Sequence, residues 1–173
     1  SQAQLQSTLS IGANDLTIHG SLSIFGNTLT ATGTFANNGT LELYGNNTIT
    51  LTQDIDSGTW KYTGSGSGTN TYTVKDFGVT DYYNLEISAG ALHTFQIASA
   101  LSVAADLTSS SSNAFASFTG NGQTVSIGSD LIITAGNYTS GSAALTIAGD
   151  LDISGGSFTG SSGSVDINDD VVL

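Results

Sequence analysis

The sequence predicts an all-β protein, a three-faced parallel β-helix (β-solenoid) with about 20 residues per coil, roughly eight to nine coils and little or no helix. Three observations predict this fold. Apolar residues recur at a fixed spacing, each short apolar segment alternates with polar residues, and Gly-Ser, Gly-Asp or Gly-Gly pairs separate the segments. No stretch combines helical spacing with capping residues, so helices are not expected.

The C-terminal part, residues 116–173, carries the most regular repeats. A triplet such as Leu145, Thr146 and Ile147 shows the period of two that turns one face of a strand inward. Three such strands per unit do not fit a hairpin array, which needs two, but they fit one turn of a triangular coil. Stacked coils then place each strand about 4.8 Å from its copy. The predicted core ladder consists of three columns at a spacing of 20: Val125, Leu145 and Val165; Leu131, Leu151 and Val171; Phe118, Tyr138 and Phe158.

The rest of the chain follows the same pattern less strictly, so we expect one solenoid domain over residues 1–173. Residues 59–115 break the register: "GSGSGTNTY" (64–72) predicts a loop at one corner, and "TSSSSNAF" (108–115) lengthens another. Residues 1–58 are predicted to form looser coils, because their apolar residues are spaced by 7, 6, 7, 6 and 6: Leu9, Leu16, Leu22, Leu29, Phe35 and Leu41.

The charge balance excludes several classes of partner. The net charge is −12, with 14 acidic residues against Lys61 and Lys75 alone. Nucleic-acid binding and attachment to an anionic membrane both require clustered Lys or Arg, so neither is expected. No apolar run approaches the roughly 20 residues that span a bilayer, and membrane insertion is not expected either. The opening "SQAQLQ" is unlike a signal peptide and suggests the start of a mature protein.

One segment carries a resemblance. "GSDLIITAGNYTSGSAALTIAGDLDISGGSFTGSSGSVDI" (128–167) resembles the repeats of bacterial extracellular β-solenoid proteins, the adhesin-like and filamentous-haemagglutinin-like surface proteins with parallel β-helix stalks. The resemblance is close over residues 118–173 and patchy elsewhere, as in "GTFANNGTLELYG" (33–45) and "TDYYNLEISAG" (80–90). It implies a structural role outside the cell or on its surface, and it brings no catalytic residues.

A column of acidic residues is the candidate metal site. Asp130, Asp150 and Asp170 recur at a spacing of 20, and stacking sets their carboxylates about 5 Å apart. Oxygen-rich corners suit Ca²⁺, with Asp152, Asp166 and Asp169 as further ligands. The alternative is that each Asp forms the corner itself by accepting a backbone N–H in an Asx-turn. The Gly-Gly-x-Gly-x-Asp repeat of calcium-binding rolls is absent.

Aromatic residues cluster in the irregular middle. Aromatic rings stack on sugar rings through their apolar faces, so this cluster is the candidate glycan-binding surface. The alternative is that the rings fill a widened core. The residues concerned are Trp60, Tyr62, Tyr72, Tyr82 and Tyr83.

An enzyme is not expected. The chain has no Arg, and His19 and His93 stand alone without further metal ligands or a Ser nucleophile in a recognisable motif. A glycosidase needs two carboxylates across a cleft. The pairs Asp54 with Asp56 and Asp76 with Asp81 are scattered and arise readily by chance.

A column of threonines, Thr119, Thr139 and Thr159, is reminiscent of ice-binding surfaces, although its neighbouring column is not Thr. A solvated face with hydroxyl ladders between strands is the usual explanation of such a column. The sequence therefore favours an extracellular or cell-surface structural solenoid, a stalk or a filament subunit that stacks end to end or continues in a longer chain. A carbohydrate- or surface-binding adhesin module is the second hypothesis.

Overall fold

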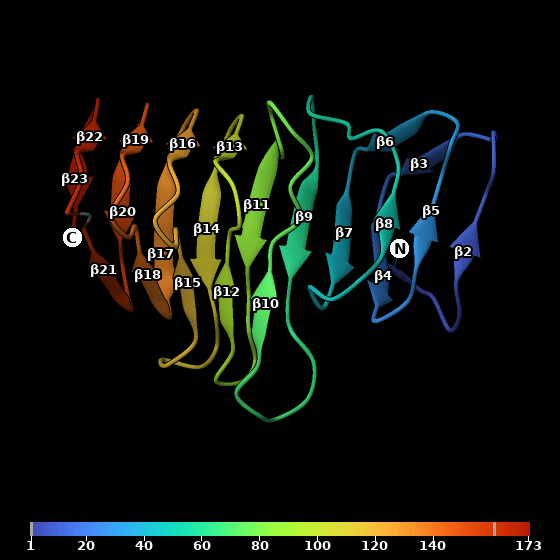
Figure 1. The fold of residues 1–173 in the computed structure, drawn as a ribbon, viewed down its shortest axis with the longest axis horizontal. Coiled ribbons are helices and arrows are strands. Elements are labelled where there is room, and N and C mark those ends of the chain that lie inside the picture. The colour runs from blue at the N-terminus through green and yellow to red at the C-terminus, as the bar shows by residue number, and fades with distance from the viewer. Residues whose placement is uncertain (1, 161) are drawn as a thin grey trace.

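A computed structural model describes residues 2–160 and 162–173 and confirms the predicted fold class. The described residues contain no helix and form a parallel β-solenoid of about 8 turns with ~20 residues per coil. The strands stack side by side along the long axis of the molecule (Figure 1). Every strand pairing in the described residues is parallel, because each strand pairs with its counterpart one coil later and not with its neighbour in sequence.

The first face of the solenoid is one sheet that runs from end to end. Its nine strands pair in unbroken succession across the described residues. They are β1 (Gln2–Gln4), β4 (Ser21–Phe25), β7 (Thr40–Leu43), β9 (Thr59–Tyr62), β11 (Asn84–Ile87), β14 (Leu107–Ser110), β17 (Leu131–Ala135), β20 (Leu151–Ile153) and β23 (Val171–Val172).

The second and third faces are each divided into two sheets near the middle of the chain. The second face holds β2 (Leu9–Ser10), β5 (Leu29–Thr30) and β8 (Ile49–Thr50), then β10 (Thr71–Thr73), β12 (Thr94–Gln96), β15 (Ser117–Thr119), β18 (Asn137–Thr139) and β21 (Ser157–Thr159). The third face holds β3 (Leu16–Ile18) and β6 (Phe35–Asn37), then β13 (Leu101–Val103), β16 (Val125–Ile127), β19 (Leu145–Ile147) and β22 (Val165–Ile167).

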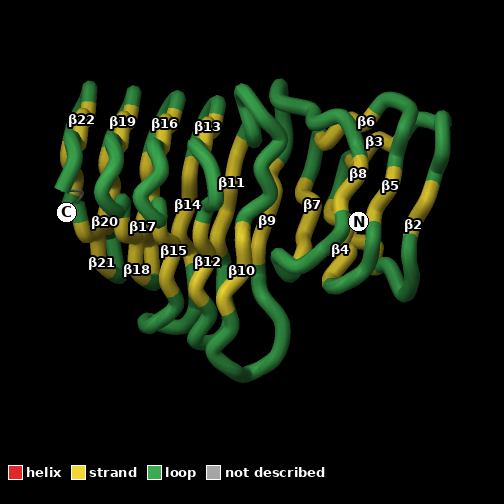
Figure 2. Tube along the Cα trace, viewed as in Figure 1, coloured by secondary structure: helices red, strands yellow, loops and turns green. Residues whose placement is uncertain are grey.

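The length of a coil changes along the chain. On the first face Leu22 pairs with Leu41, whereas Leu131 pairs with Leu151, so the later coil is slightly longer. The coils between these regions are the longest, as the pairing of Trp60 with Leu85 shows. The added length lies in the corner after β9, in the loop that projects from the solenoid between β9 and β10 in Figure 2. The "TSSSSNAF" segment differs from its predicted loop, because residues 108–110 belong to strand β14, with alternating burial, before the chain turns.

The interior is one continuous hydrophobic cluster that changes in kind along the axis. Leu131, Leu145 and Leu151 give the C-terminal coils an aliphatic centre, and they are at most 3% exposed. In the middle coils Trp60 and Tyr62 occupy the equivalent inward positions of the first face. These larger side chains fill the core of the middle coils, whereas the residues added after β9 form an exposed loop at the corner.

Candidate functional site

The aspartate column forms a ladder of hydrogen bonds between coils. The backbone N–H of Asp150 donates to Asp130 Oδ1 at 2.8 Å, and that of Asp170 donates to Asp150 Oδ1 at 2.9 Å. The ladder begins earlier, since Asp106 N–H donates to Asn84 Oδ1 at 3.1 Å and Asp130 N–H to Asp106 Oδ1 at 3.3 Å. Each side chain therefore holds the main chain of the next coil.

This arrangement differs from both sequence-based interpretations in its detail. The acceptor is a side chain, as in the Asx-turn interpretation, but the donor N–H belongs to the next coil and not to the same corner. The reason is that the short corners of adjacent coils lie in register, so an Asp Oδ1 sits directly beneath the amide of the following Asp.

The corresponding corners of the first coils use the main chain instead. Thr40 N–H donates to Gly20 O and Thr59 N–H donates to Gly39 O, each at 2.8 Å. A Cβ on Gly39 would overlap the Gly20 carbonyl oxygen, so the corner closes only without a side chain. The two halves of the solenoid thus achieve the same contact by different chemistry.

Within the described residues, the three carboxylates that come closest are not the predicted set. Asp150, Asp169 and Asp170 each offer an oxygen within 4.8 Å of the others. Asp130 is not part of this group, and its Oδ1 accepts the Asp150 amide. The structure therefore brings together two residues of the predicted column and Asp169, which was expected as a further ligand, whereas Asp152 and Asp166 are not part of this group.

The aromatic cluster lies in the core. Trp60, Tyr62 and Tyr82 are at most 1% exposed and Tyr72 is 6% exposed, while Tyr83 is only partly buried. The Trp60 ring meets Phe35, Phe77 and Tyr82 at centroid distances between 5.1 and 6.0 Å. The rings fill the widened coils and present no exposed stacking platform for a sugar.

Two of these tyrosines bond to each other inside the core. Their hydroxyls lie 2.8 Å apart; the Tyr82 hydroxyl donates to Lys75 O, and Lys75 N–H donates to the Tyr62 hydroxyl. Burial raises the pKa of Tyr62 to about 12 and also raises that of Tyr82. Tyr138, in the regular coils, has a buried hydroxyl without a partner. Burial raises its pKa too.

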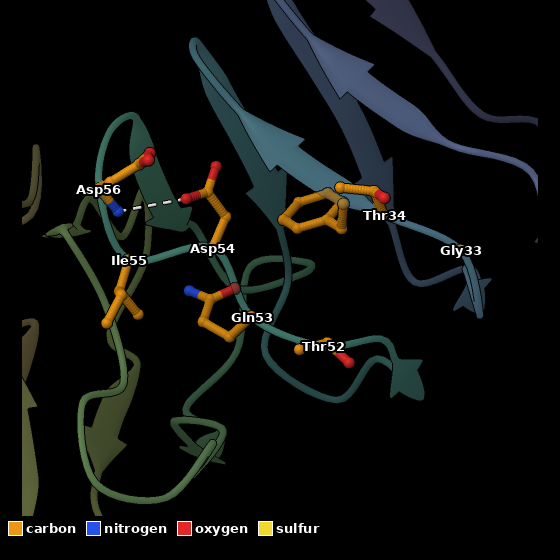
Figure 3. Close-up of a pocket in the computed structure, with 8 residues that line it drawn as sticks. Gly33, Thr34, Thr52, Gln53, Asp54, Ile55 and Asp56 are labelled. Carbon is orange, nitrogen blue, oxygen red and sulfur yellow. Dashed lines mark hydrogen bonds between the residues drawn. The ribbon is translucent and has the colours of Figure 1, made fainter.

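A hollow of about 500 Å³ opens where the third face is interrupted (Figure 3). Gly33, Thr34 and Phe35 form one wall, and residues 52–56 form the other. We call it the third-face hollow. Leu16 N–H donates to Thr34 O, so the main-chain groups of Phe35 point away from β3 and toward residues 52–56. No main-chain hydrogen bond joins Phe35 to that segment in the described part of the chain.

Both aspartates of the pair Asp54 and Asp56 line this hollow. Asp54 Oδ2 accepts the Asn37 amide at 2.8 Å, and its Oδ1 accepts the Asp56 amide at 3.1 Å. Asp54 follows Phe35 by the same interval that separates Phe35 from Leu16, so the repeat calls for an apolar residue there. The signal is present in the sequence, because a polar residue in an inward column marks a place where the face cannot close.

The other acidic pair forms a turn. Asp81 Oδ1 accepts the Phe77 amide at 2.7 Å and its Oδ2 accepts the Ser102 amide at 2.9 Å. Asp81 is 1% exposed, and burial raises its pKa against the lowering effect of these amide donors. Asp76 Oδ1 accepts the Gly78 amide at 2.8 Å. These carboxylates stabilise the corner before Tyr82.

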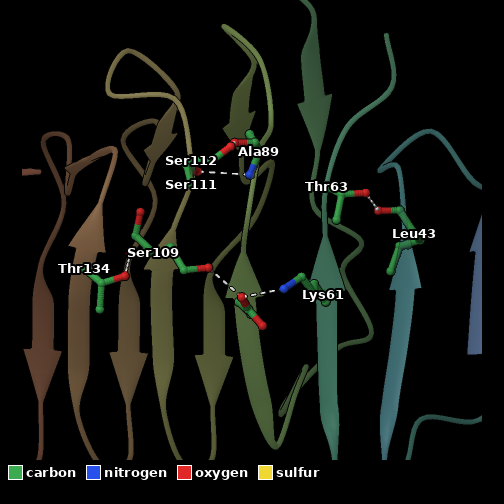
Figure 4. A network of polar contacts seen from close by, with 10 residues as sticks. Leu43, Lys61, Thr63, Ala89, Ser109, Ser111, Ser112 and Thr134 are labelled. Carbon is green, nitrogen blue, oxygen red and sulfur yellow. Dashed lines mark hydrogen bonds and ion pairs between the residues drawn. The ribbon is translucent and has the colours of Figure 1, made fainter. Parts of the chain in front are cut away.

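Both lysines and one histidine have structural contacts. Lys61 Nζ lies 2.8 Å from Glu86 Oε1, and Ser110 Oγ donates to the same oxygen, within the polar network of the first face (Figure 4). Lys75 Nζ lies 5.3 Å from the centroid of the Phe77 ring. His93 is 1% exposed and accepts the Asn70 amide through Nδ1. These contacts give each of the three a role in holding the middle coils together.

Comparison with known proteins returns no match to any family model, curated protein or solved structure. In the described residues, no helix has the length and apolar character needed to cross a bilayer.

Proposed function

We propose that this protein is a structural solenoid of the cell exterior, a rigid stalk or filament subunit that is extended at its ends by further coils. The observation that supports it most is the first face, whose nine strands pair without interruption along the whole described length. A continuous ladder of main-chain hydrogen bonds over a continuous core resists bending, because any bend must break contacts between adjacent coils.

The two ends of the solenoid support extension. One end has a hollow of about 320 Å³ lined by inward side chains of the first coil, among them Leu9, Leu16 and Leu22. At the other end Val165, Val171 and Val172 are 37–54% exposed, although they hold inward or edge positions. Such ends combine apolar surface with unpaired strand edges, which favour the addition of another strand.

The sides of the solenoid are suited to remaining separate. Its net charge of −12 is carried largely by side chains on corners and outward faces. Like charges on the flanks oppose lateral association, so contacts at the ends dominate. The resemblance to bacterial surface proteins supports a position outside the cell, and the hydrogen-bonded state of Asp54 and Asp81 supports a role without catalysis.

Electron microscopy and analytical ultracentrifugation test the proposal. We expect rods whose mean length increases with protein concentration. Val171→Lys places a charge on the apolar end and should abolish them, whereas Ser126→Lys, on an exposed outward position of β16, should leave them intact. A chain that remains monomeric at every concentration would overturn end-to-end association.

Glycan binding at the third-face hollow is the second candidate function. The hollow brings carboxylate, amide and hydroxyl groups together with the exposed side chain of Ile55, a combination that suits the polar edge and apolar face of a sugar ring. A glycan array should then show binding that Asp56→Ala removes. Asp152→Ala, on an outward position of β20, is the control and should keep the binding. An array without hits excludes this function.

A further inference from the structure

The first complete coil matches the last one in length. From the second face through the third to the first, the inward residues of both coils are spaced by 7 and then 6 positions. The next N-terminal coil has spacings of 6 and 6, so this match is specific to the first. The residues are Leu9, Leu16 and Leu22 in the first coil, and Phe158, Val165 and Val171 in the last.

We propose that residues 158–160 and 162–172 of one copy stack directly against residues 9–23 of a second copy, and that β23 of the first copy replaces β1 of the second on the edge of β4. This inference rests on the proposed function, because it specifies the joint between two subunits. The partner is thus a second copy of this chain, in one register.

The number of strands on each face requires the replacement. The first face carries nine strands, whereas the second face carries three and five in its two sheets. Among the described residues, β1 and β23 are the two outer strands of the first face. When β2 and β3 of a second copy stack on β21 and β22, its β4 arrives beside β23, in the position that β1 otherwise occupies. Both strands cannot pair with the same edge of β4.

The strand that leaves is weakly held, and the strand that enters fits better. All three residues of β1 are exposed, and its inward residue is Ala3, which pairs with Leu22. In the joint, Val171 takes the Ala3 position and fills more of the hollow at that end. Within the single chain, Leu5 N–H donates to Ser23 O at 2.9 Å. In the joint, the amide of Leu173 in the incoming strand takes the equivalent position.

Polar groups also match in this register. Asp170 comes opposite Ser21, so its carboxylate can accept the Ser21 amide as Asp150 accepts that of Asp170. His19 is exposed at the corner of the first coil and comes opposite Asn168, beside Asp169. An imidazole beside the acidic corner provides a hydrogen-bond donor at a position where a carboxylate would repel Asp169.

Engineered disulfides test this register, and the natural chain has no cysteine to interfere. Residues in register on adjacent strands lie about 4.8 Å apart, within the Cα range of disulfides. Thr17→Cys with Asp166→Cys joins outward positions of β3 and β22, which belong to opposite ends of one molecule (Figure 1) and meet only across the joint. Thr17→Cys with Asp152→Cys is the control, since Asp152 lies on another face.

We expect disulfide-linked chains from the Thr17–Asp166 pair and none from the control. A second pair, Gln4→Cys with Val172→Cys, reports a joint in which β1 stays in place. Rods that link through this second pair, or through neither, would overturn the proposed register and leave end-to-end assembly standing. Absence of any assembly by ultracentrifugation would instead overturn end-to-end association itself.

Ala3→Pro distinguishes the joint in which β1 leaves from the joint in which β1 stays. The variant should change the concentration needed for assembly in opposite directions in the two cases. Proline removes an amide from β1 and weakens its pairing with β4. If β1 must leave, the variant assembles at a lower concentration, by about tenfold for a lost pairing worth about 1.4 kcal/mol. If β1 forms part of the joint, the variant assembles less well than the natural chain, and the proposal fails.

Discussion

The irregular middle, residues 59–115, and the regular coils, residues 116–173, share one backbone ladder and differ in how their core is filled. In the middle, large aromatic side chains fill a wider core and bond to each other through their hydroxyls. In the regular coils, aliphatic columns stack with little variation, and Tyr138 keeps an unpartnered hydroxyl. The comparison teaches that one ladder can run past cores of different composition, because extra residues are accommodated in an exposed corner loop.

The largest difference in stability between the two regions should appear when the side chain of Trp60 is removed from the middle coils. Trp60→Ala deletes a fully buried indole with three aromatic neighbours, and we expect the free energy of unfolding to fall by about 4 kcal/mol. Ile147→Val, a small deletion in the regular coils, should cost about 1 kcal/mol. Denaturant unfolding measures both. A loss at Trp60 no larger than that at Ile147 would show that the indole is not tightly packed in solution.

The second largest effect should be a loss of stability of the middle coils at alkaline pH. The pKa of Tyr62 is raised by burial from 10.0 to about 12, so the folded state holds this proton more tightly than the unfolded state. Its contribution is present below pH 10 and is lost as pH rises toward 12, by roughly 2–3 kcal/mol. Thermal melts across this range should show the loss. In Tyr62→Phe the decline should be shallower, and an unchanged slope would refute the assignment.

Removal of a single tyrosine hydroxyl should also change the free energy of unfolding differently in the two regions. Tyr62→Phe takes away the bond to Tyr82 and leaves the Lys75 amide without its acceptor, which should cost about 1–2 kcal/mol. Tyr138→Phe removes a hydroxyl that has no partner and should be neutral or slightly stabilising. Chemical denaturation of the two matched variants decides this, and a cost at Tyr138 would mean that its hydroxyl is satisfied in solution.

The smallest effect concerns the aspartate ladder of the regular coils. Asp150→Asn keeps Oδ1 as the acceptor for the Asp170 amide and removes one charge beside Asp169. We expect a gain below about 0.5 kcal/mol at low salt that shrinks as salt screens the corner. Asp150→Ala, which loses the acceptor, should cost about 1 kcal/mol. Denaturant unfolding at two salt concentrations measures both changes.

The same variants decide the calcium hypothesis. If the corner only holds the main chain, the melting temperature should be the same in millimolar Ca²⁺ and in chelator. A rise with Ca²⁺ in the natural chain that Asp150→Asn abolishes would establish a metal site there.

Particular residues show what the sequence could predict. Phe118, Tyr138 and Phe158 recur at one spacing and pair in one sheet, because equal spacing forces equal positions when each coil lies on the last. Leu9 and Leu16 lie in strands as their spacing indicated. The third-face hollow could not be predicted in the same way, because one polar residue in an inward column shows a defect but not its shape.

The sequence by itself determined the three-faced parallel solenoid, since periodic apolar residues separated by turns leave few other ways to bury a core. Tertiary structure alone decided which groups face one another across coils. It placed Trp60 inside the core, and it paired each corner aspartate with the next amide. The physical reason is that periodicity is a property of the chain, whereas contacts between coils depend on corner lengths and side-chain volumes acting together.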